Sequence, residues 1–96
     1  MANIERTERE QNGRWTMSQD GKEIGHMQYR WLNKSKFDIF STVVEKEFEG
    51  QGHATELLNI AVKYARDNQK KISATCSFAK DVFEGSAQYN DAYEKN

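Results

Sequence analysis

The hydrophobic pattern of this chain changes its period once, at the segment Gly50-Gln51-Gly52. Before this segment, residues 36–45 are rich in β-branched and aromatic side chains, which favour a strand. After it, apolar residues recur with the spacing of one helix face, and they are Ala54, Leu57, Leu58, Ala61, Val62 and Ala65. This spacing predicts an amphipathic helix over about residues 52–68. The pattern therefore indicates a strand, a glycine loop and a helix in direct succession.

Three further strands are predicted in the first half of the chain, over residues 4–10, 14–18 and 22–32. The dipeptides Asn12-Gly13 and Asp20-Gly21 are typical of two-residue hairpin turns. A third turn is expected at residues 33–35. Together with residues 36–45, these segments predict a four-stranded antiparallel meander.

The second half of the chain predicts a crossover and a helical end. Residues 71–76 alternate as a short strand, and a strand–helix–strand order requires that residues 39–44 and 71–76 run parallel. Residues 77–84 are expected to form one or two helical turns, which end at Gly85. Ser86 then caps a last helix that contains Tyr89 and Tyr93. The predicted class is α/β (α+β), with the meander, a helix, a parallel strand and short C-terminal helices.

Composition limits the size of the fold and excludes several classes of function. A chain of 96 residues with 36% apolar residues indicates a single domain, residues 1–96, with a small core. Its charges nearly cancel, to a net charge of −1, which argues against a nucleic-acid or membrane-surface function. No apolar stretch is long enough to span a bilayer, and residues 1–10 are too polar for a signal peptide. The single cysteine cannot form an internal disulfide, so we expect a cytoplasmic protein. We further expect a monomer or weak dimer.

The glycine loop has the chemistry of an anion site. The first N–H groups of a helix lack partners within it, and the helix dipole adds partial positive charge there. Gly50 and Gly52 allow the backbone to approach a ligand closely. A Walker loop is excluded because Gly52 is not followed by Lys-Ser or Lys-Thr, and a Rossmann fingerprint because Thr55 stands where that motif needs glycine or alanine. Taken alone, such a glycine pair is more often a tight loop that binds nothing.

The run from residue 43 to residue 78 resembles a known family. Enzymes of the GNAT N-acetyltransferase family carry a loop of the form Gln/Arg-x-x-Gly-x-Gly/Ala between a central strand and a long helix. The aligned run here is Glu49-Gly50-Gln51-Gly52-His53-Ala54, in which Glu49 departs from the expected glutamine or arginine. Together with the preceding Val43-Val44-Glu45 and the later Cys76-Ser77-Phe78, it looks like the small single-domain GNAT-like subfamily. The resemblance covers about residues 4–93.

The resemblance implies that acetyl-CoA binds along one strand and the glycine loop. In the family, backbone groups of that strand bind the pantetheine arm, loop N–H groups hold the pyrophosphate, and the thioester enters where two parallel strands splay apart. The implied cofactor contacts are Val43, Val44, Glu45, Glu49, Gly50, Gln51, Gly52, His53, Ala54, Thr55, Ser77 and Lys80. The Glu49 carboxylate would repel the pyrophosphate unless it points outward or pairs with a base such as Lys46. His53 is either a phosphate contact or a solvated loop residue.

The resemblance also implies catalytic candidates. Cys76 lies at the end of the second splayed strand, where its thiolate could accept an acetyl group if a helix N-terminus or Lys80 lowered its pKa; the alternative is a small buried cysteine. Ser41 stands where relatives often carry histidine, and His26 replaces that base only if it faces the cleft. Tyr89, or Tyr93, is a candidate acid for the departing thiolate. No metal site is expected.

Three functions remain open from the sequence. The first is transfer of acetyl to an unidentified amine, either through Cys76 or by direct attack of the amine on the thioester. The second is a non-catalytic CoA-binding or sensing domain, to which Glu49 and Ser41 point. The third is a protein-interaction module in which the glycine loop is only a turn. So short a chain has little room for an acceptor-binding subdomain, so we expect the acceptor on an open face.

Overall fold

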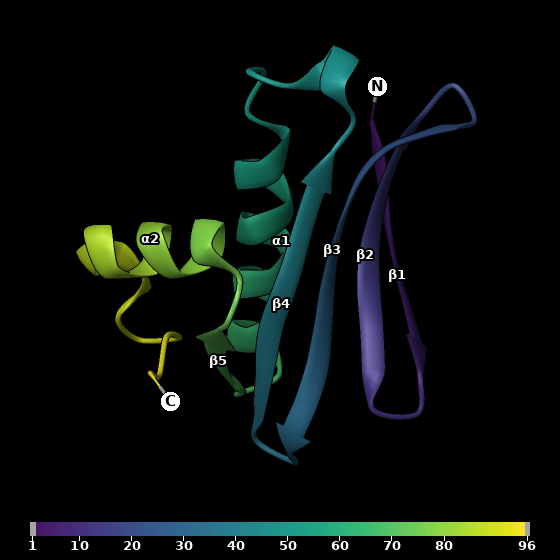
Figure 1. Ribbon diagram of the computed structural model, residues 1–96. Helices are drawn as coiled ribbons and strands as arrows, with labels where there is room; N and C mark the ends of the chain where they lie inside the picture. The colour runs from purple at the N-terminus through teal and green to yellow at the C-terminus, as the bar shows by residue number, and fades with distance from the viewer. Residues whose placement is uncertain (1, 96) are drawn as a thin grey trace.

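The computed structural model describes residues 2–95, which form one five-stranded sheet with helices packed on it (Figure 1). The strands lie in chain order and are β1 (Asn3–Arg9), β2 (Asn12–Gln19), β3 (Lys22–Asn33), β4 (Lys36–Val44) and β5 (Lys71–Ala74). The helices are α1 (His53–Asp67) and α2 (Ser77–Gly85), with short 3-10 turns η1 (Lys46–Phe48) and η2 (Ala87–Tyr89). The first four strands are antiparallel and β5 runs parallel to β4, which confirms the predicted class.

Local sequence determines the position of one hairpin turn but not of the other. Asp20 and Gly21 form the predicted turn, with φ of 53° and 79°. The predicted turn at Asn12-Gly13 is wrong, because Arg9 pairs with Asn12 and the turn lies at residues 10–11. Gly13 instead lies within β2 under Tyr29, and a Cβ on Gly13 would lie 2.2 Å from a carbon of the Tyr29 ring. This glycine serves a close packing contact, not a turn.

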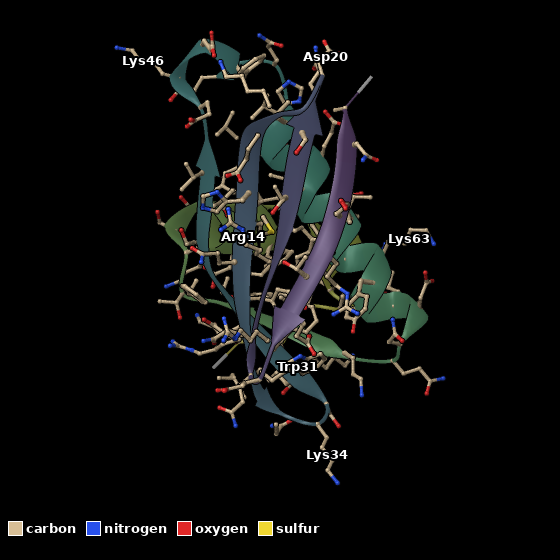
Figure 2. The ribbon with its side chains drawn as sticks, turned by 90° about the vertical axis from the view of Figure 1, so that its right-hand side faces the viewer. Arg14, Asp20, Trp31, Lys34, Lys46 and Lys63 are labelled. Atoms are coloured by element: carbon tan, nitrogen blue, oxygen red, sulfur yellow. The ribbon has the colours of Figure 1, made fainter. Side chains whose placement is uncertain are left out.

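The core lies between the sheet and α1. The buried residues of α1 are Leu57, Leu58, Ala61, Val62 and Ala65, as the helical spacing predicted. The sheet contributes an aromatic cluster in which the Trp15 ring lies 4.5 Å from that of Tyr29 and 5.7 Å from that of Tyr64 on α1. Seen from the β1 edge, α1 lies on one side of the sheet (Figure 2). Because side chains alternate along a strand, Arg14 and Thr16 point to the opposite side from Trp15.

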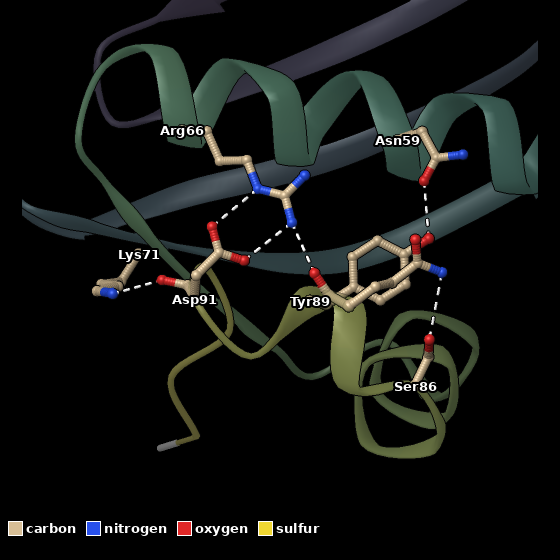
Figure 3. Close-up of polar contacts among 7 residues, drawn as sticks. Asn59, Arg66, Lys71, Ser86, Tyr89 and Asp91 are labelled. Carbon is tan, nitrogen blue, oxygen red and sulfur yellow. Dashed lines mark hydrogen bonds and ion pairs between the residues drawn. The ribbon is translucent and has the colours of Figure 1, made fainter.

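The C-terminal segment is held by β5 and α1. α2 ends at Gly85, as predicted, but the expected last helix is only the turn η2, and the Ser86 side chain caps no helix. Arg66 of α1 ties this segment down through two hydrogen bonds to the Asp91 carboxylate, each 2.9 Å, and a third to the Gln88 carbonyl (Figure 3). Beyond η2, Tyr93 forms a parallel bridge with Ile72. The chain end therefore covers the outer edge of β5.

Candidate functional site

β4 and β5 pair over only four residues and then separate. The last pair is Ile39 with Ala74. The Ile39 carbonyl accepts the N–H groups of both Thr75 and Cys76, at 2.9 and 3.0 Å, and the chain then turns into α2. From Ser41 onward, β4 pairs with β3 but no longer with β5. The two parallel strands therefore splay apart and leave an open strand edge.

A β-bulge lies where the strands separate. Tyr29 pairs with Ile39 but Gln28 pairs with Ser41, so Phe40 is an extra residue in β4. The bulge reverses the alternation of side chains, so that Thr42 lies opposite the buried Met27, on the α1 side. Ser41 is thereby turned to the face away from α1.

The open edge of β4 presents free backbone groups. The Glu45 N–H donates to the Ile24 carbonyl of β3 at 2.9 Å, and the Glu45 carbonyl accepts the Phe48 N–H at 2.8 Å. Backbone groups alternate along a strand, so those of Thr42 and Val44 face the side that β5 has left. Among the predicted pantetheine contacts, the structure thus turns Val44 toward the open edge, whereas the amides of Val43 and Glu45 face β3.

The glycine loop leads from this edge to the N-terminus of α1. Gly50 and Gly52 have φ of 77° and 85°, a left-handed conformation that favours glycine. The loop encloses a hollow of about 160 Å³ lined by Val44, Phe48, Glu49, Gly50, Gly52, His53, Ala54 and Thr55. Gly52 is the N-cap and has no side chain to occupy the helix end. Within residues 2–95, the N–H groups of residues 50–55 donate to no protein acceptor, so they remain available to an anion.

The charges around the loop are mixed. His53 is not a solvated loop residue: its side chain is 13% exposed, with Nδ1 3.0 Å from the Glu56 carboxylate and its ring against Phe48. Glu49 is exposed and has no cation within 4.0 Å in the part of the chain that the structure describes. Of the two arrangements that would reduce repulsion, the structure therefore shows an exposed carboxylate and not the ion pair with Lys46.

Cys76 spans the gap between the splayed strands. Its Sγ lies 3.4 Å from the Thr42 Oγ1 on β4, and it is half-buried. It lies beyond the end of β5, at the N-cap position of α2, where the first N–H groups of a helix have no partner within it. Ser77 and Lys80 follow it on the exposed first turn of α2. The structure therefore brings a thiol, a hydroxyl and a helix N-terminus together at the open edge.

The other catalytic candidates lie elsewhere. Tyr89 is buried and donates a hydrogen bond to Asn59 Oδ1 at 2.8 Å (Figure 3). Tyr93 donates to Glu84 at 2.9 Å, and burial together with that carboxylate raises the pKa of the Tyr93 hydroxyl. Neither hydroxyl forms a hydrogen bond with Cys76. His26 lies opposite Val43 on the face away from α1, with Nδ1 2.9 Å from the Glu23 carboxylate.

A buried carboxylate near the bulge was missed from the sequence. Asp38 of β4 is 1% exposed, and its Oδ1 accepts a hydrogen bond from Ser73 Oγ of β5 at 2.7 Å. Its Oδ2 has no partner in the described chain. The only sign of this pair in the sequence was a lone acid in a β-prone segment. The pair ties β4 to β5 one residue before they separate.

Two further features concern other classes of site. Among residues 2–95, no group of three or more histidine, cysteine or acidic side chains is arranged to hold a metal ion. Over the same residues, neither helix combines the length and apolar character that a bilayer crossing needs.

Comparison with known proteins gave a family match and several structural matches. The profile of the family described as GCN5-related N-acetyl-transferase matches residues 14–92. The fold is similar to that of a GCN5-like N-acetyltransferase candidate from Staphylococcus aureus, solved by NMR, with a TM-score of 0.75 and 32% identity over 100% of this chain and 93% of that chain. No curated protein matches the chain.

Two ligand-bound structures share the fold at lower identity. A GNAT family acetyltransferase from Elizabethkingia anophelis, with acetyl-CoA bound, is 17% identical with a TM-score of 0.59, over 65% of this chain and 41% of that chain. PaiA N-acetyltransferase from Thermoplasma acidophilum, in complex with coenzyme A, is 15% identical with a TM-score of 0.56, over 62% of this chain and 36% of that chain. The chain spans less than half the length of either protein, and the likeness shows the fold alone.

Proposed function

The chain belongs to the GCN5-related N-acetyltransferase family, and we propose that it binds acetyl-CoA at the open edge of β4 and transfers the acetyl group to an amine. Acetyl-CoA is the acetyl donor that GNAT acetyltransferases use, and two proteins of the same fold hold acetyl-CoA or coenzyme A. One observation carries the proposal: the free N–H groups of residues 50–55 and the free edge of β4 adjoin, because Val44 lines the same hollow as the loop.

This arrangement suits a long ligand with a charged end and a polar arm. The pyrophosphate would accept hydrogen bonds from the loop and from the first turn of α1, where the helix dipole favours negative charge. The amide groups of the pantetheine arm would pair with the backbone of Val44 and Thr42, as an added strand does. The thioester would then lie between the splayed strands beside Cys76.

Acetyl-CoA supplies an activated acetyl thioester, and the residues at the gap set how an amine receives it. In the direct route, the amine attacks the carbonyl carbon, and N–H groups at the start of α2 stabilise the oxyanion that forms. The bond to the CoA sulfur then breaks, CoA leaves as the thiolate, and the nitrogen gives up its proton to water. In the covalent route, the Cys76 thiolate attacks that carbon first, the bond to the CoA sulfur breaks, and an amine then takes the acetyl group from Cys76. Thr42 Oγ1 orients the Cys76 sulfur in either route.

Cofactor binding is tested by titration with acetyl-CoA, with adenosine as the control ligand. When the free acetyl-CoA concentration is one hundred times its Kd, the free energy of unfolding rises by about 2.7 kcal/mol, which a thermal shift detects readily. Ala54→Glu places a carboxylate in the loop hollow while remaining compatible with a helix N-terminus. Ile60→Glu adds the same charge at an exposed site on α1 and is the matched control. We expect at least a tenfold loss of affinity in the first variant and little change in the second; equal affinities would refute the placement.

Intact-mass analysis after incubation with acetyl-CoA separates the two routes. An added acetyl group that is lost in Cys76→Ala supports the covalent route. Full activity of Cys76→Ala, with no adduct on the unaltered protein, supports direct attack. Tight binding of acetyl-CoA without transfer to any of a broad panel of amines and peptides would instead favour the non-catalytic sensing function. That function is suggested by the departures from the family pattern at Glu49 and Ser41.

A further inference from the structure

The sheet face opposite α1 is open over its first three strands. α2 packs mainly on β4 and β5, whereas the helix that packs on β2 and β3 is α1, on the other face. Figure 2 shows the side chain of Arg14 on this face, with α1 and Lys63 on the other side of the sheet. Ser41 points to the same face, because the bulge in β4 turned it away from α1. The open face therefore begins at the splayed strands and extends to β1.

A hollow with charged and amide side chains at its rim lies on this face. It has a volume of about 300 Å³ and is lined by Thr7, Glu8 and Arg9 of β1, by Asn12, Gly13 and Arg14 of β2, and by Gln28 of β3. These side chains offer guanidinium, amide and hydroxyl donors, which bind anions. Glu8 also lines the hollow, but its carboxylate is held on the other face, where it accepts hydrogen bonds from Tyr29 and Trp31, each at 2.8 Å.

The arginines of this face have guanidinium N–H groups that no carboxylate occupies. Within residues 2–95, neither Arg9 nor Arg30 has a carboxylate within 4.0 Å. Arg14 bonds Glu23 through Nη2 alone, at 3.1 Å, and its buried Nε has no partner. Arg30 lies opposite Asn12, and its guanidinium stands 5.4 Å above the Phe40 ring at the bulge. Arg30 thus stands between the hollow and the splayed strands.

Strand register sets the distance between the hollow and the reaction site. Arg14 pairs with Gln28, and Gln28 pairs with Ser41, so one row of side chains crosses from β2 to β4. Adjacent strands are spaced about 4.8 Å apart, which places the Arg14 backbone about 10 Å from β4. A ligand whose amine reaches the gap beside Cys76 could therefore place a second group among the arginines.

We propose that this hollow binds an anionic group of the amine acceptor, so that the acceptor class is an amine with a carboxylate or similar anion at least about 10 Å from the reactive nitrogen. The inference rests on the proposed acetyl transfer. Arginine recognises carboxylates in a bidentate manner. Arg9 and Arg14 line the hollow, and Arg30 lies beside it, opposite Asn12. In an extended peptide the same distance is about three residues, at about 3.3 Å each.

The experiment compares acceptors that differ only in the anion. One pair is a peptide with a single reactive lysine and a glutamate four residues later, on the same side of an extended chain, against the same peptide with glutamine. The other pair is an ω-aminocarboxylate of similar length against its amide. We expect kcat/KM at least tenfold higher for the anionic member of a pair, and NMR titration of the labelled protein should shift the amides of Arg9, Arg14 and Gln28. The two pairs distinguish a peptide acceptor from a small molecule.

Two variants and a control locate the effect. Arg9→Gln and Arg30→Gln each remove a positive charge from the open face, and each should reduce the preference for the anionic acceptor about tenfold, the ratio expected for one charge-assisted contact. Lys63→Gln removes the same charge from α1 on the opposite side and should leave the preference unchanged. Acetyl transfer without any anionic preference, or a preference that survives both arginine variants, overturns the acceptor site alone. Failure to bind acetyl-CoA or to acetylate any amine overturns the proposed function and the acceptor site with it.

Discussion

Replacing Gly13 by alanine should destabilise the protein, although glycine within a strand is ordinarily the less stable residue. A Cβ at this position would lie 2.2 Å from Cζ and 2.3 Å from the hydroxyl oxygen of Tyr29. The ring of Tyr29 cannot move aside freely, because it packs 5.1 Å from the Phe37 ring and its hydroxyl bonds Arg6 and Glu8 at 2.9 and 2.8 Å. Overpacking costs about 1–3 kcal/mol, and loss of a hydrogen bond to a charged group about 1.5–3 kcal/mol. We therefore expect a loss of about 2–4 kcal/mol in the free energy of unfolding.

Urea denaturation followed by tryptophan fluorescence and circular dichroism measures this change. Gly85→Ala is the matched control, since a Cβ at Gly85 meets nothing within 4 Å, and it should be neutral or stabilising by up to about 1 kcal/mol. Tyr29→Ala removes the clash, so in that background Gly13→Ala should cost little, and the cycle isolates the coupling. The sign of the change in the free energy of unfolding decides between the two effects. An increase of about 0.5–1 kcal/mol in Gly13→Ala would mean that strand propensity alone governs the site and that the packing argument is wrong.

Three further predictions concern stability and pH. Ser73→Ala leaves the buried Asp38 without its hydrogen-bond donor and should cost about 1–3 kcal/mol in urea denaturation, whereas Ser41→Ala should change it by less than about 0.5 kcal/mol. Burial raises the pKa of Tyr29 to about 12 from 10.0, so the protonated phenol stabilises the fold fully below pH 10 and this contribution is lost as the pH rises from 10 to 12. An ultraviolet titration should show a tyrosine that ionises late and together with unfolding, and ionisation of all four tyrosines near pH 10 in the folded protein would contradict this. Arg66→Gln removes the contacts to Asp91 and Gln88 and should speed amide exchange at Ile72 and Glu94, whereas Lys63→Gln should not.

The parts of the site that are local in the chain were predicted from the sequence. The glycine loop, the free start of α1 and the buried face of α1 follow from residue spacing and from a glycine at the N-cap, because helix periodicity and helix ends depend on neighbours in the chain. The parallel pairing of β4 and β5 followed from the order of elements. Cys76 was expected at a strand end, and it lies at the N-cap of α2.

Pairing between distant residues decided the rest. Simple alternation from Ile39 would have placed Ser41 on the α1 side, but the bulge at Phe40 turned Thr42 there and turned Ser41 toward the open face. The bulge belongs to the pairing of β4 with β3, at the point where β5 departs, and no run of neighbouring residues encodes that pairing.

The sequence by itself determined the period of each element, the glycine loop and the likeness to a family of acetyl-CoA enzymes. Only the tertiary structure decided that Gly13 packs against Tyr29, that Asp38 is buried beside Ser73, and that the arginines gather on an open face. The physical reason is that spacing along a chain fixes which side of its own element a residue takes. Which element then covers that side depends on the register and closure of strands that lie far apart in the sequence.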